Sequence, residues 1–454
     1  MGAKLSLVLD PVLDGVALRT QTPVDPRPER ARPDVYRFLA LSAQLVLLLV
    51  VFRVYRLEQF AGDMGFFFMA CLAFAAFAVH YWLPFHWKER FWVAVSLLGA
   101  PCLLPFWRAA LLMIAGGALY VVVASPLSYW KRVSLVGAGL AAAMLFRGQP
   151  AFLSRLTHQH TLGSFWVLFG ALFMFRLIVY LHDIRYLKGR PPLTEFLAYF
   201  FILPNYIFLL FPVVDYKSMR VGYYRRDIHD IVQQGIVWIC RGTVQLLAYM
   251  LVFYARDLLP ETRSFGSMVS TMFLTFLLYL RVSGQFHISV GLLHLFGYDL
   301  PETNHKYLLS RSLTDFWRRI NIYWKEFMVK IVYFPTYFWL RKKGELRAQL
   351  AGTGLVFVVT WALHAYQTFW LRGQVPITWP DTLFWTVLGL LMILNVWWDH
   401  RHPRRKAKVT LSGRFREAAS VLGTMSVILI LWSLWSAPSV SAWFDFLRWW
   451  KPGS

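Results

Sequence analysis

The stretch LVFVVTWALHAYQTFWL, residues 355–371, is one of a series of apolar runs whose lengths suit the crossing of a lipid bilayer. Comparable runs recur from about residue 36 to residue 437. Of the 454 residues, 57% are hydrophobic and only 16% are charged, which is too few for a water-exposed surface of this size. Because backbone groups inside a bilayer must pair within the chain, we predict helices. The alternating segments typical of a membrane β-barrel are missing.

The predicted fold is therefore all-α, a polytopic integral membrane protein with about 11–13 transmembrane or re-entrant helices around a central tunnel. Several of the apolar runs are short for a straight crossing, so we expect some to be tilted, re-entrant or broken. The candidate spans lie at about 36–54, 64–84, 91–106, 109–124, 133–147, 165–182, 194–213, 235–255, 266–284, 326–340, 350–371, 381–398 and 417–436.

One apolar run is interrupted in a way that predicts a re-entrant hairpin. Residues 194–216, TEFLAYFFILPNYIFLLFPVVDY, contain Pro204 in mid-run and have basic residues on both flanks. A single crossing would place the two basic flanks on opposite sides, whereas a hairpin would place both on the cytoplasmic face. Non-helical backbone at membrane depth implies a cavity lined by protein or water.

The charge balance indicates anionic lipid headgroups and phosphates as partners. Lysine and arginine outnumber acidic residues by 47 to 24, giving a net charge of +23. The basic residues lie mainly between the apolar runs, which favours the membrane surface. We discount nucleic acid, because the sequence has no single aqueous domain large enough to hold a duplex.

Neither cysteine nor histidine spacing predicts a metal site. Cys71, Cys102 and Cys240 lie singly in apolar segments, so we interpret them as packing residues. The pairs His158 with His160 and His400 with His402 lack companion acidic or cysteine ligands at zinc-like intervals, and solvated loop residues are the better interpretation.

The segment from about 284 to 325 is less apolar than its surroundings and predicts amphipathic or re-entrant helices. Within it, the stretch 312–327, SLTDFWRRINIYWKEF, has Trp317, Asn321 and Trp324 at spacings that share one helix face. An interfacial helix with an aromatic belt explains the same pattern. As candidate substrate-binding residues we take the charged and aromatic side chains Asp315, Trp317, Arg318, Arg319, Tyr323 and Trp324.

His364 lies inside the quoted apolar run, near membrane depth. A lone buried histidine is more often a core residue hydrogen-bonded to a neighbouring helix. The alternative is a general base, because removal from water keeps the imidazole neutral and able to accept a proton from a hydroxyl.

Other polar groups in apolar segments need partners of their own. His287 and His294, seven residues apart, could share a helix face that lines a polar cavity. Cations that fall in or at the ends of spans also require partners, for which we take Asp183 and Gln245 as candidates. These cations are Arg176, Arg241 and Arg281.

Three stretches together resemble the membrane-bound O-acyltransferase (MBOAT) family. Residues 293–327, LHLFGYDLPETNHKYLLSRSLTDFWRRINIYWKEF, resemble its signature region, and residues 358–373, VVTWALHAYQTFWLRG, resemble its later histidine-bearing helix. Residues 200–216 are similar to its Phe-Pro hairpin, with Phe211 where many members have Gly. The resemblance covers roughly 165–400, and Ala365 departs from a common Gly after the histidine.

The resemblance implies roles for two residues. His364 matches the family histidine expected to act as base on an acceptor hydroxyl, and Asn321 matches a position that would orient the acceptor or stabilise the oxyanion. The donor would be an acyl-CoA or acyl-carrier thioester, a substrate rather than a bound cofactor, and no acyl-enzyme is expected. Basic loops at 214–226 and 341–347 could hold the phosphates of coenzyme A or an acidic carrier protein.

The chain is then divided into an N-terminal polar arm (1–33), peripheral transmembrane helices (34–160), an MBOAT-like catalytic core (161–400), and a basic loop with a C-terminal helix (401–454). The acceptor expected is a cell-envelope glycan or polysaccharide at a bacterial cytoplasmic membrane, with an extracytoplasmic partner acyltransferase. A lipid or sterol O-acyltransferase, favoured by Asn321, is the alternative within the class. A transporter or lipid flippase is the alternative outside it, although no inverted repeat is visible.

Overall fold

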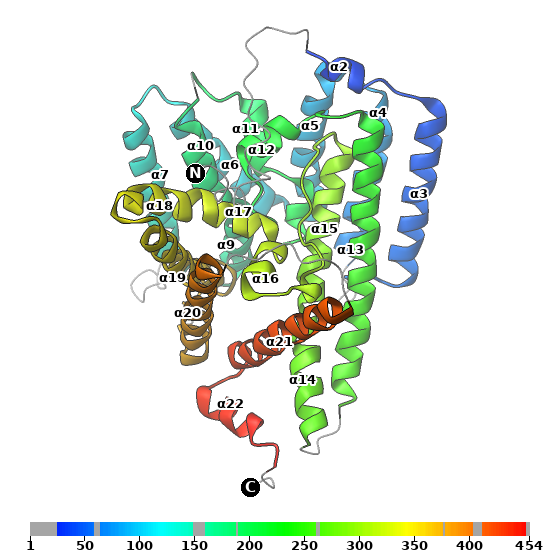
Figure 1. The fold of residues 1–454 in the computed structure, drawn as a ribbon. Coiled ribbons are helices and arrows are strands. Elements are labelled where there is room, and N and C mark those ends of the chain that lie inside the picture. The colour runs from blue at the N-terminus through cyan, green and yellow to red at the C-terminus, as the bar shows by residue number, and fades with distance from the viewer. Residues whose placement is uncertain are drawn as a thin grey trace.

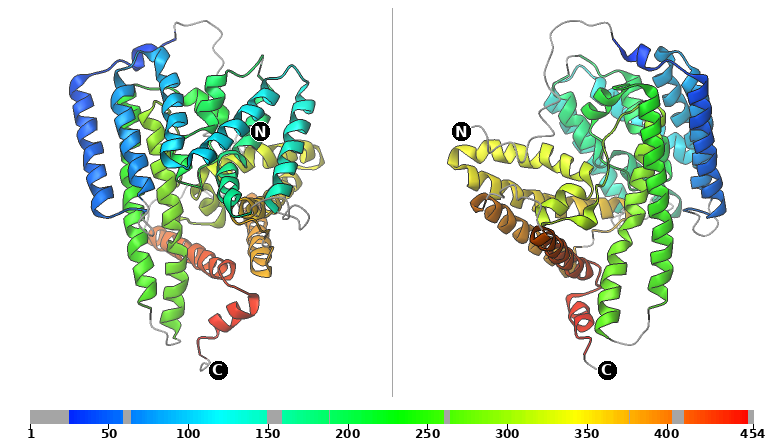
Figure 2. Two further views of the ribbon diagram at one scale, coloured as in Figure 1. Left: turned by 180° about the vertical axis from the view of Figure 1, so that it is seen from behind. Right: turned by 45° about the vertical axis from the view of Figure 1, so that its right-hand side comes forward.

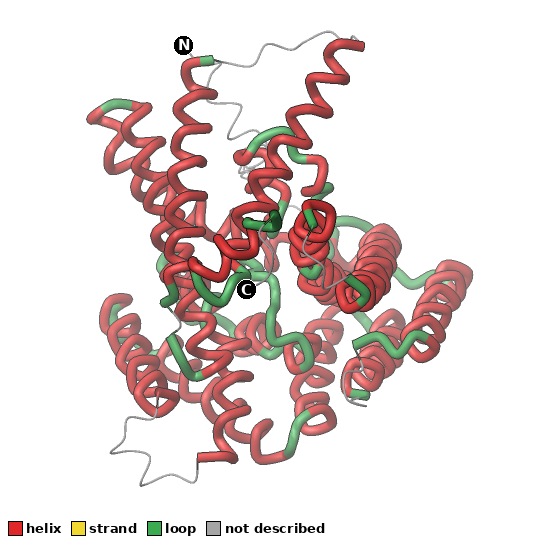
Figure 3. The backbone as a smooth tube through the Cα atoms, turned by 90° about the horizontal axis from the view of Figure 1, so that it is seen from below, coloured by secondary structure: helices red, strands yellow, loops and turns green. Residues whose placement is uncertain are grey.

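The computed structural model is all-α over the residues it describes, which are 25–58, 64–148, 159–187, 189–259, 264–375, 377–402 and 411–450. Helices and connecting loops account for the whole of this part of the chain, with no strand in it (Figures 1 and 3). Nine helices within it are long and apolar enough to cross a membrane. The prediction of an all-α polytopic membrane protein is therefore confirmed.

The first three long helices of the chain stand side by side along one flank of the molecule, and the later N-terminal helices extend to its opposite edge (Figures 1 and 2). Proline sets two of their boundaries, because Pro84 and Pro105 cannot continue the preceding helix and instead start the next one. The helices are α2 (Arg27–Arg30), α3 (Val35–Val54), α4 (Gly65–Trp82), α5 (Phe85–Leu103), α6 (Phe106–Ala124) and α7 (Tyr129–Gly148).

The run around Pro204 forms the predicted hairpin. After α9 (Gln159–Phe173) and α10 (Arg176–Ile184), the chain makes α11 (Leu193–Phe200), the 3-10 turn η2 (Leu203–Tyr206), irregular backbone and α12 (Tyr216–Gly222). The hydroxyl of Tyr216 donates a hydrogen bond of 2.8 Å to Glu195, near the start of α11. Burial, together with this carboxylate, raises the pKa of Tyr216, so the hydroxyl stays a donor. The segment thus returns to the side where it began.

The longest helical pair is built on facing glycines. α13 (Ile228–Asp257) packs along α14 (Phe265–Leu277) and α15 (Tyr279–Leu295), which together form one 31-residue candidate span. A Cβ added at Gly242 would lie 2.6 Å from the carbonyl oxygen of Gly284, and one at Gly235 would lie 2.8 Å from that of Gly291. Glycine at these four places lets the two backbones touch, as in other membrane helix pairs.

The prediction of amphipathic or re-entrant helices from about residue 284 was wrong for its first part. Residues 284–295 continue α15 and are buried on all sides. Their polar side chains suggested a segment outside the core, but these side chains form hydrogen bonds inside the protein. His287 Nδ1 lies 2.8 Å from Gln245 Oε1, and the Nε2 of His294 accepts the backbone N–H of Leu300.

The C-terminal helices cross the α13–α15 pair at a steep angle and form the other half of the molecule (Figure 2). The π-helical turn η4 joins this half to the hairpin, because Lys330 forms ion pairs with Asp183 and Asp215. The elements are η3 (Tyr307–Leu309), α16 (Leu313–Arg319), α17 (Ile322–Met328), η4 (Val329–Tyr333), α18 (Phe334–Leu340), η5 (Arg341–Lys343), α19 (Glu345–Arg372), α20 (Trp379–Arg401), α21 (Leu411–Trp435) and α22 (Val440–Leu447).

Two sets of predicted details need correction. The run 326–340 is not one span but the end of α17, η4 and α18. The three arginines for which partners were predicted also use other partners than Asp183 and Gln245. Arg176 donates to the carbonyl of Tyr199 at 2.8 Å, while Arg241 pairs with Glu302 and Arg281 with Glu58. Backbone carbonyls freed by the broken hairpin explain why Arg176 needs no acidic residue.

Candidate active site

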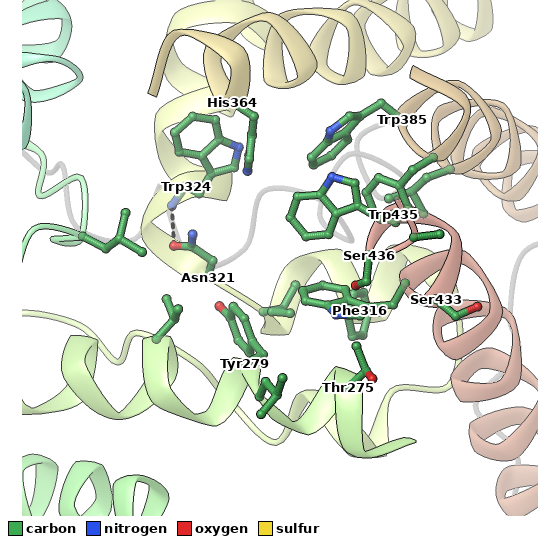
Figure 4. Close-up of a pocket in the computed structure, with 18 of the residues that line it drawn as sticks. Thr275, Tyr279, Phe316, Asn321, Trp324, His364, Trp385, Ser433, Trp435 and Ser436 are labelled. Atoms are coloured by element: carbon green, nitrogen blue, oxygen red, sulfur yellow. Dashed lines mark hydrogen bonds between the residues drawn. The ribbon is translucent and has the colours of Figure 1, made fainter. Parts of the chain in front are cut away.

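A cavity of about 780 Å³ lies between α14–α15, α16–α17 and α19–α22, and both His364 and Asn321 line it (Figure 4). Figure 4 shows these two side chains, from different elements, on the same side of the space with Trp324 between them. Trp317 and Lys325 also line it. Buried apolar residues surround the cavity, among them Phe316 and Trp385.

His364 is held in one tautomer by its own helix. Its Nδ1 lies 2.9 Å from the carbonyl oxygen of Thr360, one turn earlier in α19. A carbonyl can only accept, so Nδ1 carries the proton and, in the neutral ring, Nε2 keeps a lone pair. That lone pair is what a general base needs.

Indole rings enclose the imidazole of His364. The ring centroid of His364 lies 5.3 Å from that of Trp324, 4.7 Å from that of Trp385 and 6.2 Å from that of Trp435. These three tryptophans come from α17, α20 and α21. The environment of the imidazole is thus apolar and rigid, which limits competition from water for its lone pair.

Asp381 fixes one wall of this enclosure. Its two carboxylate oxygens accept the indole N–H groups of Trp361 and Trp435, each at 2.8 Å. The residue lies in the first turn of α20, where Thr378 caps the helix. One carboxylate therefore ties α19, α20 and α21 together beside His364.

Asn321 stands at a break in the chain rather than inside a helix. The prediction that Trp317, Asn321 and Trp324 share the face of one helix was wrong, because α16 ends at Arg319 and α17 begins at Ile322. Asn321 is the N-cap of α17, with φ 43° and ψ 64°. The three side chains nevertheless meet at the cavity, since the break turns Asn321 toward it.

Hydrogen bonds hold Asn321 on both sides. Its side-chain oxygen accepts the backbone N–H of Trp324 at 3.2 Å, and its backbone N–H donates to the side-chain oxygen of Asn304 at 2.8 Å. Asn304 also accepts the hydroxyl of Tyr279, another residue of the lining. The side-chain NH₂ of Asn321 has no hydrogen-bond partner among the described residues, so it remains available to a ligand.

Four predicted binding residues do not line the cavity. The hydroxyl of Tyr323 donates to the carbonyl of Pro301 at 2.9 Å. Arg319 donates to Asp315 at 2.8 Å, and Arg318 is exposed. These residues shape the α16–α17 turn instead of contacting the space beside His364. His287 and His294 likewise do not line this cavity, because both are buried in α15 against α13.

The sequence reasoning missed Trp385, Trp435, Asp381 and Arg256. Tryptophan at a helix end is also what a lipid interface selects, so spacing alone could not show that these rings face inward. The unusual feature was Asp381 at the start of an apolar helix, since a carboxylate there needs a partner.

Among the described residues, neither a cysteine nor a cluster of possible metal ligands lies at this cavity. Cys71, Cys102 and Cys240 are free, and none of them lines the cavity. In the described part of the chain, no three histidine, cysteine or acidic residues gather as metal ligands would. His158, the side chain of His160 and most of the basic loop after His402 lie outside the described residues.

Comparison with protein-family models finds no match for this chain, and comparison with curated proteins finds none either. The function must therefore be inferred from the site itself.

Proposed function

We propose that the protein is a membrane-bound O-acyltransferase, which moves an acyl group from acyl-CoA or an acyl-carrier thioester to a hydroxyl of a cell-envelope glycan or polysaccharide. The observation that carries this proposal is the meeting of His364 and Asn321 at one cavity. The two residues reach it from separate elements, and both belong to the motifs that resemble the MBOAT family.

His364 acts as the general base in this reaction. The acceptor hydroxyl gives its proton to Nε2 while its oxygen attacks the carbonyl carbon of the thioester. A C–O bond forms, the C–S bond breaks, and the thiolate leaves with the proton that the imidazole returns. The bond from Nδ1 to Thr360 stabilises the imidazolium formed in between, in the way a fixed acceptor orients other catalytic histidines.

Asn321 donates a hydrogen bond in this reaction and takes no part in proton transfer. Its NH₂ group is directed to the cavity by the cap of α17 and can donate to the acceptor or to the oxyanion of the tetrahedral intermediate. A single such donor is worth roughly 3 kcal/mol in other acyl-transfer enzymes, provided that it is held rigidly. The backbone bond to Asn304 provides that rigidity.

The location proposed is a bacterial cytoplasmic membrane. The face of the protein at which the hairpin begins and ends, called here the hairpin face, is rich in basic residues, with Lys217, Arg220, Arg225 and Arg226 close together in sequence. Such faces are cytoplasmic by the positive-inside rule. A donor carrying phosphates would approach from this face.

Reconstitution with a radiolabelled acyl thioester tests the proposal. The wild-type protein should consume the thioester and transfer the label to an acceptor or to water, and His364→Ala should lower the rate by at least about 100-fold, as loss of a general base does. His400→Ala is the matched control, because His400 is exposed at the end of α20 and should leave the rate unchanged. Circular dichroism and thermal unfolding verify that both variants fold.

Two results would contradict the proposal. Undiminished thioester consumption by a folded His364→Ala variant would remove the base assignment. Movement of a labelled lipid or sugar across the membrane without thioester consumption would instead show a transporter. If the label were found only on added diacylglycerol or sterol, the glycan acceptor would be wrong and the lipid alternative correct.

A further inference from the structure

The cavity has a second end, away from Asn321 and His364. There it is lined by the C-terminal end of α13, the second half of α14 and helices α21 and α22. Figure 4 shows Ser433 and Thr275 on the opposite side of the space from Asn321. No step of the proposed reaction uses this end.

Among the described residues, no acidic side chain lines the cavity or pairs with the arginine at this end. The residues that line the cavity include Arg256 and Lys325 but no aspartate or glutamate. Lys325 forms an ion pair of 2.5 Å with Glu326. Arg256 is exposed and has no ion pair with any described residue. A cation in this position is ready to bind an anionic group of a ligand.

Hydroxyl groups and an indole ring line the same cavity as Arg256. Thr271, Ser433 and Ser436 line it, as does Trp443. The indole N–H of Trp443 donates to Ser433 at 3.0 Å, which fixes α22 over this part of the cavity. Flat rings beside small hydroxyl side chains suit a sugar, whose apolar face stacks on an indole while its hydroxyls form hydrogen bonds.

The distance between the two ends requires an extended ligand. Tyr279 bonds to Asn304, the residue that holds Asn321, and so marks the depth of the proposed reaction centre. Thr271 lies eight residues earlier in the same helix, which places it about 12 Å away along the axis. A ligand that contacts both ends must therefore be longer than a small alcohol.

The second end also faces the side where an envelope glycan would be found. α13 starts beside the basic hairpin face and runs for 30 residues, or about 45 Å, before it ends next to Arg256 (Figure 1). Because the hydrocarbon core is about 30 Å thick, the two ends of α13 lie on opposite sides. With the hairpin face cytoplasmic, Arg256 is on the extracytoplasmic side.

We propose that this end of the cavity binds an acidic glycan as acceptor, with a carboxylate or phosphate of the glycan paired to Arg256 and a sugar ring stacked on Trp443. The inference rests on the proposed acyl transfer for its reaction, but the binding itself needs no thioester. The negative charge of the glycan would then set the acceptor specificity, since a neutral glycan leaves Arg256 without a partner.

Binding of oligosaccharides to the full-length protein in phosphatidylcholine nanodiscs tests this inference. The probes are a uronic-acid oligosaccharide and a neutral one of equal length, followed through the fluorescence of the cavity tryptophans. The acidic probe should bind the wild type more tightly. Arg256→Gln should weaken its binding by about tenfold and leave the neutral probe unaffected, whereas Arg256→Lys should retain most of the affinity.

The matched control is Arg53→Gln, because Arg53 is exposed on α3 and does not line the cavity. Equal affinity of the two probes, or an equal loss in Arg53→Gln, would overturn the inference. Displacement of the acidic probe by phosphatidylglycerol in the nanodisc, dependent on Arg256, would assign the site to a lipid headgroup and also overturn it. If thioester consumption required His364 but was unchanged by the acidic probe, this inference would be wrong while the proposed acyl transfer would still hold.

Discussion

Asn321 combines two demands that few residues satisfy. Its backbone is left-handed, a conformation that costs most side chains roughly 1 kcal/mol but that asparagine tolerates. Its side chain also caps α17 by accepting the N–H of Trp324. The same amide then keeps its NH₂ group for a ligand, so structure and proposed chemistry depend on different atoms of one residue.

Substitutions at this position should separate the two roles. Asn321→Gly keeps the left-handed backbone and serves as an acceptable N-cap, so we expect a loss of only a few tenths of a kcal/mol in the free energy of unfolding. Asn321→Ala should cost about 2 kcal/mol, because cap and backbone preference are both lost. Both variants should lose most of the transfer rate, measured beside thermal unfolding in detergent.

The opposite pattern would contradict this assignment. If Asn321→Gly transferred label at the wild-type rate, the side-chain amide would have no part in the reaction. If the two variants unfolded at the same temperature, the cap and the left-handed backbone would not be the source of the stability difference.

His364 could be singled out from the sequence because it is polar inside an apolar run, and Asn321 because of its spacing to Trp317 and Trp324 and the resemblance of its stretch to the MBOAT signature. What surrounds them could not. Trp385 and Trp435 resemble the many tryptophans of a lipid interface, and only the packing of α20 and α21 turns them toward the imidazole. Their contribution depends on contacts between distant segments, which spacing within one segment does not encode.

At the scale of elements, local signals predicted a break in a helical run better than they predicted whether a segment is buried. Pro204 correctly indicated a broken hairpin, since proline removes a backbone donor and bars the helical conformation before it. By contrast, the polar residues of α15 suggested an exposed segment, but they are buried against α13 and the hairpin. Hydropathy measures the preference of a residue for lipid and cannot show that a polar side chain has a partner inside the protein.

The glycine contacts between α13 and α15 make a quantitative prediction about packing. Gly242→Ala would place a Cβ 2.6 Å from the carbonyl oxygen of Gly284, a backbone atom that cannot move without separating the helices. We expect a loss of about 1–3 kcal/mol in the free energy of unfolding, typical of overpacking. Thermal unfolding in detergent, followed by circular dichroism, measures it.

Gly137→Ala is the matched control for this experiment. Gly137 lies in α7 with no atom within 4 Å of an added Cβ, so alanine should stabilise the protein by about 0.5–1 kcal/mol through its higher helix propensity. A destabilisation as large as that of Gly242→Ala would show that alanine is harmful at any helical glycine here. The close contact of α13 and α15 would then not explain the effect.

At the scale of the whole molecule, two apolar cores meet along α10, α15 and α17. One joins the N-terminal helices to α13 and α15, and the other surrounds the cavity between α16 and α21. The cavity thus lies inside the core between α16 and α21, and residues of the hairpin form part of its lining. This arrangement separates a basic face at the hairpin from an end lined by Arg256, as a reaction that joins substrates from two sides would require.

Labelling of single cysteines can test this two-sided arrangement. In a protein whose Cys71, Cys102 and Cys240 are replaced by alanine, a cysteine would be placed at an exposed position, one per variant: Leu193 at the start of α11, Val221 in α12, or Leu258 after α13. A membrane-impermeant maleimide should label the first two from the same side, because the hairpin returns to it, and the third only from the other side.

The pattern of labelling distinguishes the two claims. Labelling of Leu193→Cys and Val221→Cys from opposite sides would mean that the broken segment crosses the membrane, which the bond between Tyr216 and Glu195 argues against. Labelling of Leu258→Cys from the same side as Val221→Cys would mean that α13 does not cross. Arg256 would then face the cytoplasm, where an envelope glycan could not reach it, while the roles of His364 and Asn321 would be unaffected.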